Sequence, residues 1–302
     1  DFSYPYFPGL RRYVPAVPFA VFFALCGAVW TLLVSEKMRT RIILSVIISL
    51  CFAFTVFSYF YIWTMAAAWL ASLVLLFLVF RPEGWVRDFK AFCAVGAACA
   101  VSLLPYAYLL SKRSHTMDDV QLLVMTREPD LFRTPEIISY AVILMALLAA
   151  AMKVVNLKDR ATVFVLSLAI SVIVVFNQQI ITGRSLQPIH YHVFVGNYVA
   201  GLSLVLMLGI LVKSLAESRW KAPAFASLAV LAAVWGIVEC HYTVRVLDEA
   251  NVIRDEGMPV AARLRELATT DVPSPNSQRA VTLSFSHIQA DDLPTIAPQA
   301  VL

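Results

Sequence analysis

The chain of 302 residues has few charged side chains: 15% are Asp, Glu, Lys or Arg, whereas soluble domains average about 25%. Hydrophobic residues make up 60% of the sequence and its mean hydropathy is +0.75. These values exclude a disordered chain, a collagen-like repeat and an ordinary soluble domain. The net charge of +4 does not indicate nucleic acid as a partner, because most basic residues stand in short stretches between apolar runs.

Cysteine is also scarce, and the sequence contains no C-x-x-C pair. Metal and redox roles for the cysteines are therefore not expected, and a disulfide scaffold is excluded. All five fall inside apolar runs or at their edges, where cysteine packs as a small hydrophobic residue. They are Cys26, Cys51, Cys93, Cys99 and Cys240.

The apolar residues are gathered in uncharged runs long enough to cross about 30 Å of hydrocarbon. The second run has 39 residues, so we expect it to form two helices with a turn near Ser58, Tyr59, Phe60 and Tyr61. The sequence thus predicts an α-helical polytopic membrane protein with about eight transmembrane helices. The runs are 13–34, 42–80, 91–110, 137–152, 161–176, 193–212 and 222–238.

Basic residues occupy alternate gaps between these spans. Because short basic loops face the cytoplasm, this pattern predicts that both termini and the other three loops lie outside. Arg11 and Arg12 are the exception, which a further span upstream would explain. The gaps predicted to be cytoplasmic contain Lys37, Arg39 and Arg41; Arg81, Arg87 and Lys90; Lys153, Lys158 and Arg160; and Lys213, Arg219 and Lys221.

The composition changes after residue 240. A charged stretch with helical periodicity precedes a linker at 271–277, and residues 280–285 have the pattern of a strand. We expect an outer segment at 1–12, a transmembrane helical domain at 13–240 and the start of a small outer α/β tail at 241–302. Because residue 1 is Asp and the tail ends at this strand pattern, the chain is expected to be an excerpt of a longer protein.

The polar residues are densest at 177–192, which is predicted to be an outer loop. Arginine can bind phosphate through two parallel hydrogen bonds, amides can donate to and accept from sugar hydroxyls, and histidine can transfer protons near neutral pH. The alternative is that these residues cap helix ends at the headgroups. We favour a substrate-binding loop over that alternative and over a metal site at the two histidines. The residues predicted to bind substrate are Asn177, Gln178, Gln179, Arg184, Gln187, His190 and His192.

The longest predicted loop, 111–136, has two further features. The pair Asp118 and Asp119 makes a divalent cation possible, although such pairs are usually only solvated. Residues 120–125 are apolar and are expected to form an interfacial helix. No ionisable residue stands near the centre of a span, which argues against an ion-coupled transporter.

The chain resembles bacterial multi-spanning membrane glycosyltransferases of the C-type superfamily (GT-C). The likeness consists of many spans with short cytoplasmic loops, polar outer loops, and a final span that leads into PVAARLRELA (259–268) and then a strand (280–285). The resemblance implies sugar transfer from a polyprenyl-phosphate-linked donor on the outer face of a bacterial inner membrane. The expected partners are this lipid-linked donor and membrane lipids.

The family's catalytic acid lies in the first outer loop, which would fall before or at Asp1, so the catalytic residue stays unassigned. In the transfer that the resemblance implies, a carboxylate deprotonates the acceptor and Arg184 contacts the lipid phosphate. Two alternatives remain open: an envelope polysaccharide polymerase or ligase, and a membrane transport or assembly subunit without enzymatic activity.

Overall fold

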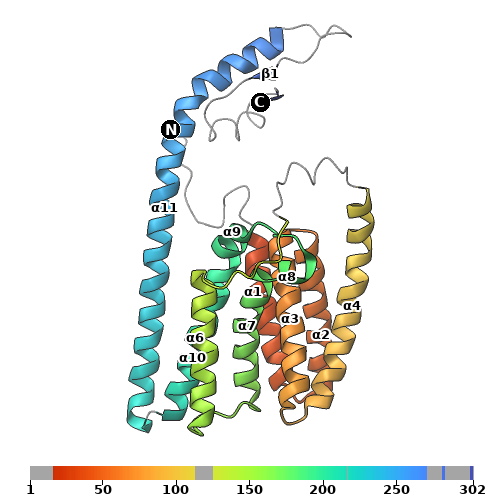
Figure 1. Cartoon of the computed structure of the whole chain (residues 1–302), viewed down its shortest axis with the longest axis vertical. Helices are drawn as coiled ribbons and strands as arrows, with labels where there is room; N and C mark the ends of the chain where they lie inside the picture. The colour runs from red at the N-terminus through yellow and green to blue at the C-terminus, as the bar shows by residue number, and fades with distance from the viewer. Residues whose placement is uncertain (1–15, 113–124, 216, 271–280, 283–299, 302) are drawn as a thin grey trace. The chain divides into compact units, whose positions relative to one another are not determined.

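The computed structural model describes residues 16–112, 125–215, 217–270, 281–282 and 300–301, and these residues are mostly helical. Contacts divide the chain into two units, and the division falls within the last helix, after Ala232. We describe each unit by itself. The larger unit contains the helices that Figure 1 shows side by side as a bundle.

Within the described residues, eight helices are long and apolar enough to cross a membrane. This confirms the predicted class, an integral membrane protein built of helices; the side on which each loop lies stays a prediction. The helices are α1 (Ala16–Val34), α2 (Met38–Val56), α3 (Phe60–Phe80), α4 (Trp85–Ser111), α6 (Thr134–Ala151), α7 (Arg160–Phe176), α10 (Asn197–Leu215) and α11 (Ser218–Thr270).

The long apolar run at 42–80 divides where the sequence predicted. Helix α2 ends at Val56 and α3 begins at Phe60, so the turn consists of residues 57–59. The structure corrects the predicted span at 193–212, because α10 begins only at Asn197. The residues between α7 and α10 form three short helices: α8 (Gln179–Thr182), α9 (Pro188–Tyr191) and the π-helix η2 (His192–Gly196).

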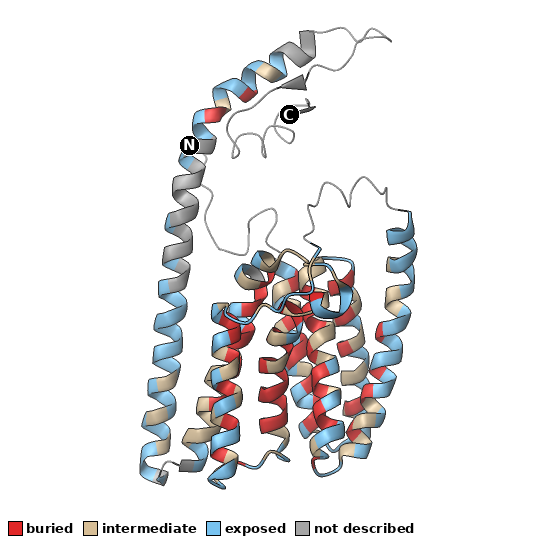
Figure 2. Ribbon diagram, viewed as in Figure 1, coloured by how far each residue is buried: buried red, intermediate tan, exposed pale blue. Residues whose placement is uncertain are grey.

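Helices α3 and α7 form the centre of the bundle. Most residues of α7 are buried, as Figure 2 shows, whereas α4 buries few of its side chains. The indole of Trp69 on α3 is fully buried, and its Nε1 donates to Ser167 Oγ on α7 at 2.9 Å. This bond satisfies the only polar atom of a large buried side chain. Phe22 and Phe164 pack edge-on against the same indole.

One end of the bundle, which we call the basic end, contains the connections at 35–37, 81–84 and 152–159. Here the fully buried carboxylate of Asp88 accepts from two guanidiniums, Arg41 at 2.8 Å and Arg160 at 2.9 Å. Arg41 also donates to the carbonyl of Leu32 at 2.7 Å. Three helices, α2, α4 and α7, and the end of α1 are thus joined by one set of charged hydrogen bonds.

The predicted α/β tail is not supported. In the second unit, the described residues are the rest of α11 and two strands of two residues each, β1 (Val281–Thr282) and β2 (Ala300–Val301), which pair in parallel. Four residues are too few for a sheet with its own core. The remainder of the strand pattern at 280–285 lies outside the described residues. The predicted boundaries after residues 12 and 240 stay predictions.

We expect Asp88→Ala to destabilise the protein strongly. Removing one member of a buried ion pair leaves the other charges without compensation and costs about 3–5 kcal/mol. Glu36→Gln serves as the control, because Glu36 pairs with Arg87 at the same end but is exposed. The measurement is the thermal unfolding midpoint in a neutral detergent. Equal midpoints for the two variants would contradict a structural role for the buried carboxylate.

Candidate functional site

The opposite end of the bundle, which we call the polar end, contains residues 57–59, 125–133 and 177–196. Figure 1 shows α8 and α9 at this end. The segment at 125–133 lies against the segment at 177–184: Met125 and Arg184 form an antiparallel β-bridge, and the amide of Thr126 donates to Gly183 O at 3.2 Å. Two loops that are distant in the sequence therefore form one surface.

Asn177 joins these two loops. Its Oδ1 accepts from the amide of Asp130 at 2.9 Å, and its Nδ2 donates to Asp130 O and Glu136 Oε1 at 2.8 Å each and to Ile173 O at 3.0 Å. Glu136 is fully buried, and its other oxygen accepts from the amide of Arg133 at 3.3 Å, at the start of α6. The geometry gives the Asn177 amide an internal, structural role.

The neighbouring amides are also engaged within the protein. Gln178 Nε2 donates to Arg184 O at 2.8 Å, and its Oε1 accepts from Thr182 Oγ1 at 2.7 Å. Gln179 is buried, and its Nε2 donates to Glu128 O at 3.1 Å. Substrate binding by these residues stays a prediction, but these hydrogen bonds explain how the loop keeps its shape.

The second half of the loop rests on α3. The ring of His190 stacks on the ring of Tyr61, with a centroid distance of 4.7 Å and an angle of 6° between the planes. The hydroxyl of Tyr61 donates to Gln187 Oε1 at 2.5 Å. The buried hydroxyl of Tyr191 lies 2.8 Å from Thr64 Oγ1. Two predicted site residues, Gln187 and His190, are thereby brought together on one aromatic platform.

His192 begins the π-helix η2. Helices of this kind occur mostly as single turns and are frequent at functional sites. The turn is tight around Gly196, where a Cβ atom would lie 2.8 Å from Tyr191 O. Burial lowers the pKa of His192, and the positive charge of Arg133 lowers it further, while Asp130 opposes these effects. Burial also lowers the pKa of His190. Both imidazoles therefore favour the neutral form, which can accept a proton.

The two arginines Arg127 and Arg184 at this end differ in whether their guanidiniums bind other parts of the protein. Arg127 donates from Nη1 to Ile180 O at 2.8 Å and to Ile181 O at 3.1 Å, so it holds the carbonyls of α8. Gly183 adopts a positive φ of 75° directly after α8, which turns the chain towards Arg184. Arg184 is exposed, and its guanidinium makes no hydrogen bond or ion pair with another described residue. It is thus available to an anionic ligand.

The carboxylates of the polar end also differ in whether they have a partner within the protein. Asp130 forms an ion pair with Arg133, and Glu136 accepts from Asn177. Glu128 is exposed, and within the described part of the chain its carboxylate has no partner. No three His, Cys, Asp or Glu residues gather as metal ligands among the described residues. The predicted acidic pair Asp118–Asp119 lies outside them.

The predicted interfacial helix at 120–125 also falls largely on residues that are not described. Its last residue, Met125, is extended and forms the β-bridge with Arg184. The sequence offered no indication of a site role for Tyr61 or Thr64, which lie 126 to 129 positions from Gln187, His190 and Tyr191. It also offered none for Arg133, which affects the pKa of His192, 59 positions further along the chain. The aromatic cluster at 58–61 was the available signal, but it indicated only a turn at the membrane surface.

Comparison with known proteins adds no assignment at this point: the chain matches no protein-family model, no curated protein and no solved structure.

Asn177→Ala is expected to loosen the polar end. The variant removes four hydrogen bonds and leaves buried acceptors unsatisfied, which costs about 1–3 kcal/mol per buried group. We expect a lower unfolding midpoint and faster amide exchange in residues 125–136. Asn156→Ala is the matched control, because Asn156 is exposed and its side chain makes one local bond to the amide of Lys158. Unchanged exchange at 125–136 in Asn177→Ala would refute the structural role.

The histidine environment predicts a pH response. Because the pKa of folded His192 lies below the usual value of about 6.5, the unfolded chain binds protons more readily. The neutral His192 therefore contributes its full stability above the unfolded pKa. This stability is lost as the pH falls from there through the lower pKa of the folded state. Arg133→Gln should raise the pKa of His192, since it removes a positive charge and frees Asp130 from its ion pair. A titration by NMR of ring-labelled histidine measures this; a lower pKa in the variant would contradict the prediction.

Proposed function

We propose that this protein is a membrane glycosyltransferase that binds a polyprenyl-phosphate-linked sugar at its polar end. The observation that carries the proposal is the contrast within one loop. The side chains of Asn177, Gln178 and Gln179 are tied internally, whereas Arg184 presents an exposed guanidinium. Further along the loop, His190 stacks on Tyr61 of α3 and forms an aromatic platform. A rigid scaffold that leaves a few polar groups exposed is the usual form of a ligand site.

The exposed Arg184 and the half-buried Gln187, His190 and His192 each suit one part of such a donor. Arg184 matches the lipid phosphate, because a guanidinium binds phosphate oxygens through two parallel hydrogen bonds. Gln187 and the neutral imidazoles of His190 and His192 match the sugar hydroxyls, since these groups both donate and accept. The apolar surface of the helices below this end suits the polyprenyl chain.

Transfer also needs a base for the acceptor hydroxyl. Among the described carboxylates of the polar end, Glu128 is the exposed one, and its backbone carbonyl accepts from Gln179 in the same surface. In the proposed step, Glu128 takes the proton of the acceptor hydroxyl and the acceptor oxygen forms a bond to the anomeric carbon. The bond from that carbon to the phosphate oxygen breaks, and polyprenyl phosphate leaves with its negative charge facing Arg184.

The proposal is tested by sugar transfer from a lipid-linked donor with the purified chain in liposomes. Arg184→Ala should lower kcat/KM about 10²–10³-fold, the usual loss when one group that stabilises developing charge is removed. Glu128→Gln and His190→Ala should also lower it, Glu128→Gln mainly through kcat. Arg39→Ala is the control, because Arg39 is an exposed arginine of the basic end; its transfer rate should not change.

Three results would overturn the proposal. Transfer that is equal in wild type, Arg184→Ala and Glu128→Gln would remove the polar end from the reaction. Binding of the lipid-linked donor without transfer, at the same affinity in all variants, would instead favour a transport or assembly subunit. A product in which whole oligosaccharide units are joined would favour the polymerase or ligase.

A further inference from the structure

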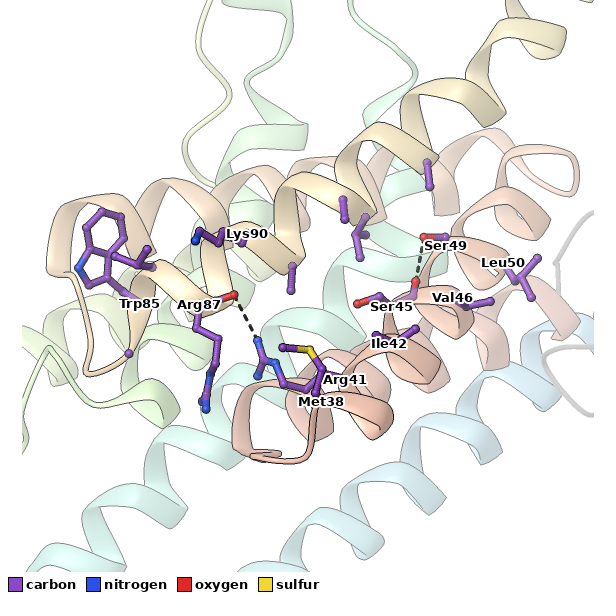
Figure 3. Close-up of a pocket in the computed structure, with 16 residues that line it drawn as sticks. Met38, Arg41, Ile42, Ser45, Val46, Ser49, Leu50, Trp85, Arg87 and Lys90 are labelled. Carbon is purple, nitrogen blue, oxygen red and sulfur yellow. Dashed lines mark hydrogen bonds between the residues drawn. The ribbon is translucent and has the colours of Figure 1, made fainter.

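A large cavity of the described residues lies at the basic end. It is a groove of about 1180 Å³ between α2 and α4. Figure 3 shows Trp85, Arg87 and Lys90 towards one end of the groove and Ser49 and Leu50 towards the other. Small-molecule pockets enclose about 300–1,000 Å³, so this groove is large enough for a longer ligand.

The groove is amphipathic along its length. Of the sixteen residues that line it, three are cations (Arg41, Arg87 and Lys90) and none is an acid. Beyond the cations the walls of the groove are mostly apolar. The two polar side chains there are Ser45 and Ser49. Ser49 Oγ donates to Ser45 O at 2.8 Å within its own helix, so its hydroxyl needs no ligand.

The length of the groove corresponds to one leaflet. From Arg41 to Leu50 the wall on α2 rises by nine residue steps, or about 14 Å at 1.5 Å per residue. The hydrocarbon core of a bilayer is about 30 Å thick, so half of it is about 15 Å. A ligand whose charged end lies at Lys90 would therefore reach the middle of the membrane.

The three cations of the groove differ in whether an acidic side chain of the protein pairs with them. Arg41 is buried and bound to Asp88, and Arg87 pairs with the exposed Glu36. Lys90 is exposed and makes no hydrogen bond or ion pair with any residue that the structure describes. Arg81 stacks over Trp85 at 5.5 Å, which adds a further cation beside an aromatic ring suited to the membrane interface. Positive charge thus remains where a lipid headgroup would lie.

We propose that this groove binds an anionic phospholipid from the leaflet at the basic end. The phosphate lies at Lys90 and Arg87, and an acyl chain follows Ile42 and Val46 on α2 and Ala94 and Ala98 on α4. Since Ala94 and Ala98 have short side chains, α4 leaves room for the chain. This site lies at the end of the bundle opposite to the proposed sugar-transfer site and does not depend on it.

The test is lipid binding to the purified chain in a neutral detergent, followed by native mass spectrometry. The probes are phosphatidylglycerol and phosphatidylcholine with identical acyl chains. Wild type should prefer phosphatidylglycerol, and Lys90→Gln should weaken its binding about fivefold, which corresponds to the ~1 kcal/mol of one basic residue at an anionic membrane surface. Ala94→Leu should weaken binding of both lipids, because it fills the groove without changing the charge.

Arg39→Gln is the matched control, since Arg39 is an exposed cation of the same end that does not line the groove. Equal binding of the two lipids, or equal loss in Lys90→Gln and Arg39→Gln, would overturn the proposal. Displacement of phosphatidylglycerol by polyprenyl phosphate in wild type, blocked by Ala94→Leu, would also overturn it and assign the groove to a donor lipid. Sugar transfer in Lys90→Gln should match wild type, which separates this test from that of the proposed function.

Discussion

The buried carboxylate of Asp88 is the interaction on which the arrangement of the bundle depends. Within a bilayer, apolar side chains gain little by leaving lipid for protein, so close packing and hydrogen bonds between helices hold a bundle together. Helix α4 buries few side chains and has the weakest packing of the helices that precede the polar loops. Its link through Asp88 to Arg41 on α2 and Arg160 on α7 fixes it to the centre at one end. The groove between α2 and α4 can remain open along the membrane because this link already holds the two helices.

Hydrogen bonds between distant segments also hold the polar end together, but here some charged side chains are left exposed. Asn177, Glu136 and Asp130 use their polar atoms on one another, and this closed set fixes α6 to the end of α7. Arg127 does the same for α8. Two charged side chains of the same loops stay outside this set: Arg184 and Glu128 are exposed. A buried polar network that satisfies itself provides rigidity, and the groups left outside it are available for a ligand.

The sequence was sufficient for features that depend on hydropathy. The uncharged runs predicted eight helices, and the polar aromatic cluster after Val56 predicted the turn between α2 and α3. It was insufficient where pairing between distant residues decides the role. Asn177 and Arg184 stand in one loop and both looked like binding residues, yet only contacts with residues 41 to 59 positions away distinguish them. Likewise, Arg41 was predicted as a loop cation, although it is buried within the first turn of α2 because Asp88 compensates its charge.

The predicted α/β tail is not supported, and here too contacts between distant residues decide the structure. A charged helical pattern followed by a strand pattern predicted an α/β unit, but a strand contributes to a fold only when partners cover one of its faces. In the part of the tail that the structure describes, the strands have two residues each and cannot supply such a face. In the bundle, a polar side chain has a structural role where its hydrogen bonds are satisfied within the protein, and it is available to a ligand where they are not. The side chains of Asp88 and Asn177 have partners within the protein, whereas the charged groups of Arg184 and Lys90 have none among the described residues. These two cations stand at opposite ends of the bundle, and the fold leaves each of them available to an anionic ligand.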